Sequence, residues 1–405
     1  MNRVLAGGLA VVVLVAGVAI GIVAGSAAGS PSPSPVAVVS PAPPTPSPSP
    51  APTSGATPPP TPTPTVTPEP TPTPEPTPVL VAAPLTGRPV TEALASRRVI
   101  AVMIDDLYAA RPQSGLSEAS VVWHAPAEGG IPRYMALFAE GNPPQVGPIR
   151  SARMYYIAWA AEWNAVFVHA GGSPQAIDYL ASSKGRGDVV YNADALRGNG
   201  HNFTWRAKWR DAPHNVYSNN NRLRAWVKKV GAGPNESGPA WRFAPDADLA
   251  LRPEGGKIIV PYPYNKVVYR YHRGSNTYLR SVSSEGKQVD RATKVRIAPK
   301  NVIVMFMRFG PLDDGSHKGR LEADYIGSGK ALIATNGKTI VGTWVKRSMK
   351  GPTRFFDKAG NPVTLTIGQT FVQVIQRGAN VTYENGKVPA PSASPAASPS
   401  PSAIP

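Results

Sequence analysis

The stretch AVFVHAGGSPQAIDYLAS, residues 165–182, decides the class of fold. Residues 165–169 form an apolar run rich in Val and Phe, which predicts a buried strand. The glycine pair at 171–172 predicts a tight turn. The Ser–Pro pair at 173–174 is typical of a helix start, because Ser can cap free N–H groups and Pro fits the first turn. A strand that turns directly into a helix indicates an α/β fold.

The same alternation of strand and helix extends on both sides of this stretch. Buried strands are predicted at 98–104, 119–123 and 134–139, and helices at 151–163, beginning at Ser151, and at 218–230, beginning at Ser218 and ending before Gly231. Together these elements predict an α/β N-terminal domain over residues 80–235.

The later part of the chain shows the pattern of a β domain. Apolar runs predict strands at 257–260, 266–272, 302–307, 329–335, 339–345 and 371–375. Asn336-Gly337 and the stretch 359–361 are turn signals between them. They predict a mostly β C-terminal domain over residues 240–385, packed against the first domain. The boundary falls in the Gly/Pro/Asn-rich stretch 232–240.

The N-terminus predicts a membrane location. Residues 4–25 form an unbroken apolar run that is long enough to cross a bilayer. Arg3 precedes the run and no Lys or Arg follows before Arg88, which predicts a cytoplasmic N-terminus with the folded part outside. We predict a membrane anchor or signal segment at 1–29. Retention as a transmembrane helix is favoured, and cleavage near the small residues 26–28 is the alternative.

Two further segments have no globular pattern. Residues 30–79 are rich in Pro, Thr and Ser, a composition that predicts a disordered, extended stalk. The tail, residues 388–405, is rich in Pro, Ser and Ala and is also predicted to be disordered. We therefore expect the folded part to act at a distance from the membrane.

The composition limits the partners. The formal net charge is +17, and the stalk and tail carry almost none of the basic residues. A basic extracytoplasmic domain favours an anionic cell-wall or envelope component over nucleic acid, although solubility is an alternative reason for the charge. The chain has no cysteine, which excludes disulfides, Cys-ligated zinc and a lipidated N-terminal cysteine.

The stretch GPIRSAR, residues 147–153, is the first candidate for chemistry. If Ser151 begins a helix, Arg150 and Arg153 flank its N-terminus, where free N–H groups and the helix dipole attract anions. This pattern predicts an anion-binding site. The alternative is that both arginines pair internally with acidic residues. The acidic candidates are Asp105, Glu128 and Glu162.

His169 and His214 are the best candidates for acid–base chemistry. His169 ends a predicted strand before the glycine turn, and a buried, hydrogen-bonded ring is its alternative role. A metal site with a carboxylate is also open, although the histidines lack the usual ligand spacing. Serine catalysis at Ser151 or Ser173 lacks a nucleophile-elbow motif. We predict no metal and no cofactor.

Residues 199–210, NGHNFTWRAKWR, alternate aromatic and basic side chains. Such a stretch can stack on a glycan and pair with a polyanion. The alternative is that the rings pack inward and the cations face solvent.

These motifs together resemble the YerB-like lipoprotein family of bacteria. The matching stretches are 84–87, 111–116, 128–130 with Arg133, 146–153, 168–174 and 212–215, followed by 327–331, 342–344, 352–353 and 365–376. The resemblance implies a two-domain envelope protein outside the cytoplasmic membrane, without an agreed reaction, cofactor or catalytic residue. Many relatives carry a lipidated cysteine, and here the apolar helix would replace the lipid.

We predict a binding module that holds an anionic envelope component in a cleft lined by Arg and His. The predicted ligand-binding residues are Arg111, Glu128, Arg133, Arg150, Ser151, Arg153, His169, Ser173, His214 and Asn215. A hydrolase or transferase on a cell-wall polymer, with His169 or His214 as general base, is the alternative. A scaffold for protein interactions in the envelope is the third hypothesis.

Overall fold

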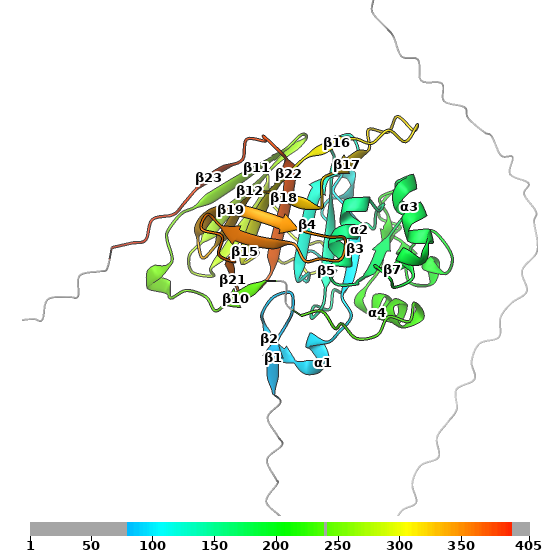
Figure 1. Cartoon of the computed structure of the whole chain (residues 1–405), viewed down its shortest axis with the longest axis horizontal. Coiled ribbons are helices and arrows are strands. Elements are labelled where there is room, and N and C mark those ends of the chain that lie inside the picture. The colour runs from blue at the N-terminus through cyan, green and yellow to red at the C-terminus, as the bar shows by residue number, and fades with distance from the viewer. Residues whose placement is uncertain (1–78, 239–240, 391–405) are drawn as a thin grey trace, which may run out of the picture. The chain divides into compact units, whose positions relative to one another are not determined.

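The computed structural model describes residues 79–238 and 241–390 (Figure 1). The predicted anchor at 4–25 lies outside these residues, as do nearly all of the predicted stalk and tail. Within the described ranges, no helix is both long enough and apolar enough to span a bilayer.

One mixed sheet of ten strands runs through the molecule, in the order β20-β19-β18-β15-β22-β4-β5-β3-β6-β7. Its strands are β3 (Ile100–Asp105), β4 (Val121–Pro126), β5 (Pro132–Phe138), β6 (Val166–His169), β7 (Tyr191–Asp194), β15 (Asn301–Met307), β18 (Gly327–Thr335), β19 (Lys338–Lys346), β20 (Arg354–Asp357) and β22 (Thr370–Gln376). Every residue of β3 is buried, which explains the apolar run of this interior strand.

The two halves that the sequence separates near residue 240 share this sheet. β22 lies at the junction, because it pairs in parallel with β15 on one side and with β4 on the other. Thr370 of β22 lies opposite Val121 of β4. The N-terminal half is mixed α/β and the C-terminal half is largely β, as the sequence predicts, and backbone hydrogen bonds join them edge to edge.

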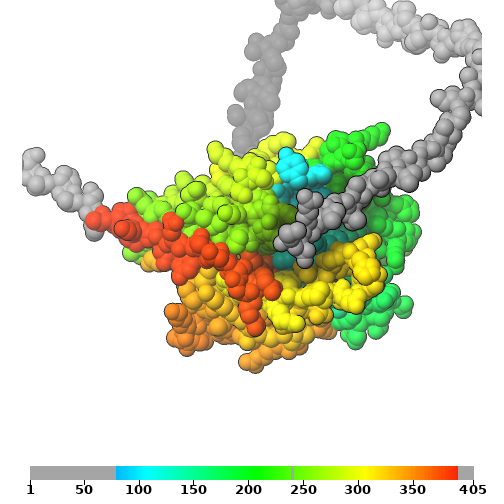
Figure 2. All heavy atoms as spheres, turned by 90° about the horizontal axis from the view of Figure 1, so that it is seen from above, coloured from blue at the N-terminus to red at the C-terminus, as the bar shows by residue number. Residues whose placement is uncertain are grey.

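A second sheet of five strands has the order β14-β13-β12-β11-β23. Its strands are β11 (Lys257–Tyr262), β12 (Asn265–His272), β13 (Thr277–Val282), β14 (Gly286–Lys287) and β23 (Thr382–Glu384). Burial alternates along β11 and β13, as expected for a sheet with one face on the core. The C-terminal β23 pairs with β11, and Figure 2 shows this end of the chain, in red, crossing the surface.

Four short strand pairs complete the chain. They are β1 (Leu80–Ala82) with β2 (Pro89–Thr91), β8 (Trp205–Arg206) with β9 (Val216–Tyr217), β10 (Arg242–Ala244) with β21 (Thr364–Thr366), and β16 (Phe309–Pro311) with β17 (Leu321–Ala323). The short helix α1 (Glu92–Ala95) follows β2. The β10–β21 pair is parallel and ties the start of the C-terminal half to its last third.

Both faces of the ten-stranded sheet are covered, one by two helices and the other by a third helix together with the second sheet. Helices α2 (Met154–Ala161) and α3 (Pro174–Ala181) share a core with Met103 of β3. Helix α4 (Asn220–Lys229) and the five-stranded sheet share the other core with Ile104, the next residue along β3. Successive side chains of a strand point to opposite faces, so one apolar run supplies both cores.

The structure corrects two predicted helix starts and confirms a third. Arg153 is the N-cap residue of α2 and Asn219 that of α4, so the predicted caps Ser151 and Ser218 are wrong. Extended backbone pairing causes both shifts: Ala152 bridges to Gly172, and residue 218 bridges to residue 146. Ser173 is the N-cap residue of α3, as predicted, although its hydroxyl makes no capping bond.

Candidate functional site

The candidate site begins at Asp105, the last residue of β3. This carboxylate is almost completely buried, and it accepts a hydrogen bond from the backbone N–H of Leu107 at 3.1 Å. Its Oδ2 lies 2.7 Å from His214 Nδ1 and 2.8 Å from Arg150 Nε. Residues 147–150 run beside the end of β3, since Asp105 N–H donates to the carbonyl of Pro148 at 2.9 Å. Asp105 therefore brings together two of the predicted site residues.

The contact with Asp105 fixes the orientation of the His214 ring. Because Nδ1 faces a carboxylate, Nδ1 carries the proton in the neutral ring and Nε2 keeps its lone pair. His214 lines a cleft of about 430 Å³, and Nε2 is the nitrogen left for a ligand in that cleft. An imidazole held in this way can bind a ligand group or take a proton from it.

The cleft itself is basic. Its lining residues are Ala109, Arg111, Trp209, Arg210, Asp211, His214 and Arg291. Three guanidinium groups thus face one exposed carboxylate, Asp211. The Arg291 guanidinium stacks over the Trp209 ring at 4.4 Å from its centroid. Arg210 donates to the carbonyl of Pro112 at 2.9 Å, and no carboxylate among the described residues pairs with Arg210 or Arg291. These two charges are the ones that an anion could neutralise.

Arg111 forms a fixed wall of the cleft. Its Nε lies 2.9 Å from Asp106 and its NH1 lies 2.7 Å from Glu285 of the C-terminal half. Its side chain is only 9% exposed. Two carboxylates therefore balance the charge of Arg111. We expect Arg111 to shape the cleft and not to supply charge for an anion.

Behind Arg111 lies a buried polar network that joins both halves. His124 of β4 lies 2.9 Å from Asp106 through Nε2 and 2.9 Å from Gln373 of β22 through Nδ1. Burial alone would raise the pKa of Asp106, but His124, Arg111 and Arg280 outweigh it and the pKa lies below its ordinary value. Burial lowers the pKa of His124, because Asp106 only partly offsets the loss of solvation. Both ring nitrogens of His124 face oxygen atoms, which favours the charged ring, but burial has the larger effect on its pKa. We therefore assign a neutral His124 beside an ionised Asp106.

This network should make stability depend on pH. His124 has a lowered pKa in the folded state, so the unfolded chain gains a proton below about pH 6.5 that the folded chain does not accept. We expect the free energy of unfolding to fall from about pH 6.5 to pH 5, with His124 contributing up to about 1.4 kcal/mol per pH unit. His124→Gln should flatten this slope in urea unfolding at several pH values. Parallel profiles for the two proteins would contradict the assignment. Asp106 acts in a separate pH range. Its pKa is lowered in the folded state, so the stability that it contributes is lost only as the pH falls below about 3.8.

The predicted anion receptor around residues 147–153 forms a closed cluster. Glu128 contacts Arg153, lies 3.1 Å from Arg133 and lies 3.2 Å from Arg320 of the C-terminal half. Burial would raise the pKa of Glu128, but the three guanidinium groups lower it below its ordinary value. Burial lowers the pKa of Arg153 to about 10. Ser151 contributes only its carbonyl, which accepts from Arg133 at 3.2 Å. Arg150 pairs with Asp105 and Arg153 pairs with Glu128, as the alternative of internal pairing describes.

The remaining predicted site residues lie apart from the cleft. His169 is fully buried, with Nδ1 2.8 Å from the carbonyl of Gly171 and Nε2 2.7 Å from Asn192 Oδ1. Ser173 is buried at the start of α3. Asn215 accepts a hydrogen bond from Arg206 at 2.8 Å. The structure thus gathers Arg111, Arg150 and His214 around Asp105 and Asp106, and it leaves His169 in a structural setting.

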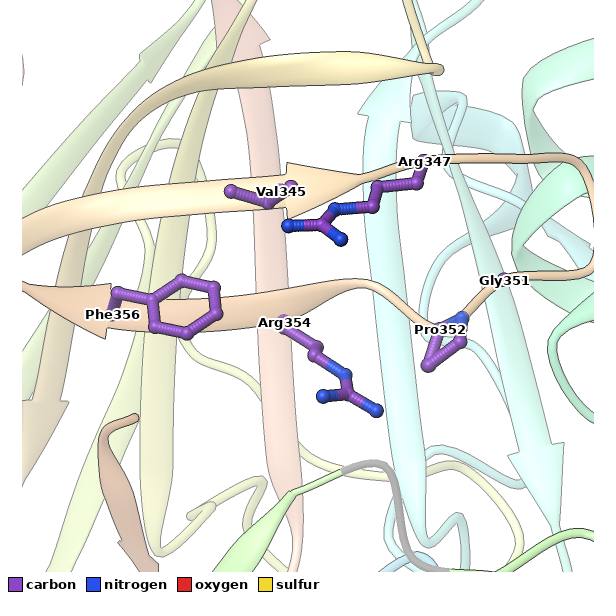
Figure 3. Close-up of a pocket in the computed structure, with 6 residues that line it drawn as sticks. All are labelled: Val345, Arg347, Gly351, Pro352, Arg354 and Phe356. Atoms are coloured by element: carbon purple, nitrogen blue, oxygen red, sulfur yellow. The ribbon is translucent and has the colours of Figure 1, made fainter. Parts of the chain in front are cut away.

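A second basic cleft, of about 260 Å³, lies between β19 and the loop before β20 (Figure 3). Arg347 and Arg354 line it together with Phe356, and Figure 3 shows the Arg347 guanidinium between the two chain segments and the Arg354 guanidinium pointing away from it. No predicted site residue lines this cleft. Neither arginine pairs with a carboxylate among the described residues. This pair provides a matched control for the removal of charge from the first cleft.

Several residues of the first cleft were missed by the sequence analysis. Trp209 and Arg210 belong to the aromatic and basic stretch 199–210, but nothing connected that stretch to His214. Arg291 gave no signal, since it reaches the cleft through a backbone hydrogen bond to Gln113 at 2.8 Å. His124 lies in an apolar strand pattern that hides its polar partners. Across residues 79–238 and 241–390, no group of three or more His, Asp or Glu side chains is arranged to hold a metal ion.

Comparison with known proteins identifies the family. Residues 85–233 match the N-terminal domain of DUF3048, described as a protein of unknown function, and residues 258–372 match its C-terminal domain. The chain belongs to the DUF3048 family. It is 34% identical to "Putative lipoprotein YerB" of Bacillus subtilis (strain 168) over 268 residues, which cover 65% of this chain and 77% of that protein. The resemblance to the YerB-like family is thereby confirmed.

A solved structure of this DUF3048 family supports the fold. The crystal structure of YerB protein from Bacillus subtilis matches with a TM-score of 0.66 and 27% sequence identity. The match covers 75% of this chain and all of that one. The overall fold therefore occurs in a related protein of known structure.

Proposed function

We propose that this DUF3048 protein is tethered outside the cytoplasmic membrane and binds an anionic component of the cell envelope in the cleft beside His214. One observation carries the proposal: Arg210 and Arg291 line the cleft, and neither pairs with a carboxylate among the described residues. Half-buried guanidinium groups held against a Trp ring and a fixed carbonyl are suited to carboxylate or phosphate groups.

The proposed location outside the membrane is supported by the N-terminal sequence and by the similarity to YerB. The apolar run at 4–25, with Arg3 before it and no further Lys or Arg until Arg88, favours a single membrane span with the folded part outside. A relative whose name describes a lipoprotein is consistent with an envelope location. Because this chain has no cysteine to carry a lipid, the apolar run would anchor the protein in the membrane.

A second candidate function is favoured by the pair Asp105–His214. A histidine whose Nδ1 contacts a buried carboxylate at 2.7 Å can act as a general base through Nε2. The cleft would then hold a wall polymer for hydrolysis or group transfer. No hydroxyl or thiol nucleophile is among the residues that line it. Water would therefore be the nucleophile in hydrolysis, and a hydroxyl or amine of a second wall strand would be the acceptor in group transfer.

One experiment separates the two functions. The folded part is incubated with purified cell wall and sedimented, and both bound protein and soluble wall fragments are measured. Binding alone predicts retention that salt reverses, with no fragments released. Catalysis predicts fragments that His214→Ala no longer releases. If the protein stays in the supernatant at low salt and releases nothing, both functions are wrong and a scaffold role remains.

A further inference from the structure

A third cleft, of about 340 Å³, also has Arg111 in its lining. Tyr108, Asp106 and Arg111 contribute to it from the end of β3, and Tyr264, Asn265 and Ser284 contribute from the five-stranded sheet. Arg111 lines both this cleft and the basic cleft of His214. One elongated ligand could therefore lie across the Arg111 wall and occupy both.

Two exposed tyrosines, Tyr108 and Tyr264, line this cleft. Tyr108 and Tyr264 are each 72% exposed, and within the part of the chain that the structure describes neither ring stacks on another aromatic ring. Tyr108 lies in the short 3₁₀ turn Tyr108–Ala110, whereas Tyr264 lies in the turn between β11 and β12. Exposed rings around a cleft are available to a ligand, because burying them removes apolar surface from water while the hydroxyls stay wet.

The polar groups of the cleft suit a sugar. Asn265 and Ser284 line the cleft, and the Asn265 amide donates to Ser284 Oγ at 3.1 Å. The second amide hydrogen of Asn265 is left to donate to a ligand hydroxyl. Sugar rings have flat apolar faces and polar edges, which match aromatic rings flanked by amide and hydroxyl groups. The adjoining basic cleft adds a place for a negative charge on the same molecule.

We propose that the Tyr108–Tyr264 cleft is a sugar-binding subsite, and that the ligand of the protein is an anionic glycan. This inference rests on the proposed anion binding in the cleft of His214. The sugar ring lies against the tyrosines, and its carboxylate or phosphate reaches over Arg111 toward Arg291. The ligand class is a wall polysaccharide with acidic substituents. On a peptidoglycan strand these are the free lactyl carboxylates where stem peptides are absent and the carboxylates of the stem peptides where they are present.

The test uses three soluble probes and measures dissociation constants. The probes are peptidoglycan strands without stem peptides, the same strands with stem peptides, and inorganic polyphosphate, which has charge but no rings. We expect Tyr108→Ala/Tyr264→Ala to weaken binding of both strands about tenfold and to leave polyphosphate unchanged. Tyr383→Ala is the control, because Tyr383 is exposed on β23 outside both clefts.

The outcomes distinguish this inference from the proposed function. If the wild-type protein binds polyphosphate but no strand, or if the tyrosine variant binds every probe normally, the sugar subsite is wrong and anion binding survives. If the loss is confined to strands with stem peptides, the cleft holds a peptide and the sugar subsite is again wrong. If no probe binds, both ideas fail.

Discussion

The variant Arg210→Gln/Arg291→Gln should bind purified cell wall about 100-fold more weakly than the wild-type protein at low salt. Each substitution removes a charge that no carboxylate among the described residues balances, and a hydrogen bond to a charged group contributes about 1.5–3 kcal/mol. Two such contacts, partly screened by solvent, correspond to about 3 kcal/mol. Sedimentation with increasing amounts of wall measures the change.

The matched control is Arg347→Gln/Arg354→Gln, which removes the same charge from the cleft of Figure 3. We expect this control to weaken binding by less than about threefold, through net charge alone. Arg210 also donates to the carbonyls of Ala109 and Pro112, so its substitution could disturb the local fold. The single variant Arg291→Gln keeps these bonds and tests the loss of charge alone. Equal losses in the two double variants would mean that the protein binds wall by overall charge and that the cleft is irrelevant.

A second large effect is expected at the buried ion pair of Lys346 and Glu162. Lys346 Nζ lies 3.0 Å from Glu162 Oε1, and both side chains are at most 1% exposed. Thr353 donates to the same carboxylate through its backbone N–H at 3.0 Å and its hydroxyl at 2.6 Å. Burial raises the pKa of Glu162 and lowers the pKa of Lys346, so each charge depends on the other.

Lys346→Met should lower the free energy of unfolding by about 3–5 kcal/mol, because it leaves a buried carboxylate without its cation. Denaturant unfolding monitored by tryptophan fluorescence measures the loss. Lys346→Met/Glu162→Gln should recover most of it, since a neutral amide can still accept from Thr353. A single variant as stable as the wild-type protein would show that water reaches the pair.

Local patterns predicted the elements of this fold well. The run at 165–169, the glycine pair and the Ser–Pro start became β6 and α3, because these signals act between neighbouring residues. Asn336-Gly337 forms the turn between β18 and β19, with positive φ at both residues, as predicted. Strand β13 was not predicted. Its sequence is TYLRSV, and one of its buried positions is Arg280, which breaks the apolar pattern that indicates a strand.

The site was harder to predict, because its residues meet through distant contacts. Asp105 and His214 are separated by 109 positions, and both were candidates without any sign that they touch. Arginines and acids in one domain can pair in several ways, and only the fold selects Glu128 for Arg153 and Asp105 for Arg150. Lys346 and Glu162 show the same limit, since the sequence offered Glu162 as a partner for arginine.

The pairing of β22 with β4 has a consequence for how the protein is made. A chain synthesised from its N-terminus presents β4 long before residue 370 emerges, so the interior edge of the growing sheet stays open during synthesis. A chain cut near residue 240 would keep that open edge permanently and would tend to aggregate. The two halves are therefore one unit of biogenesis, and neither is expected to serve as an independent module.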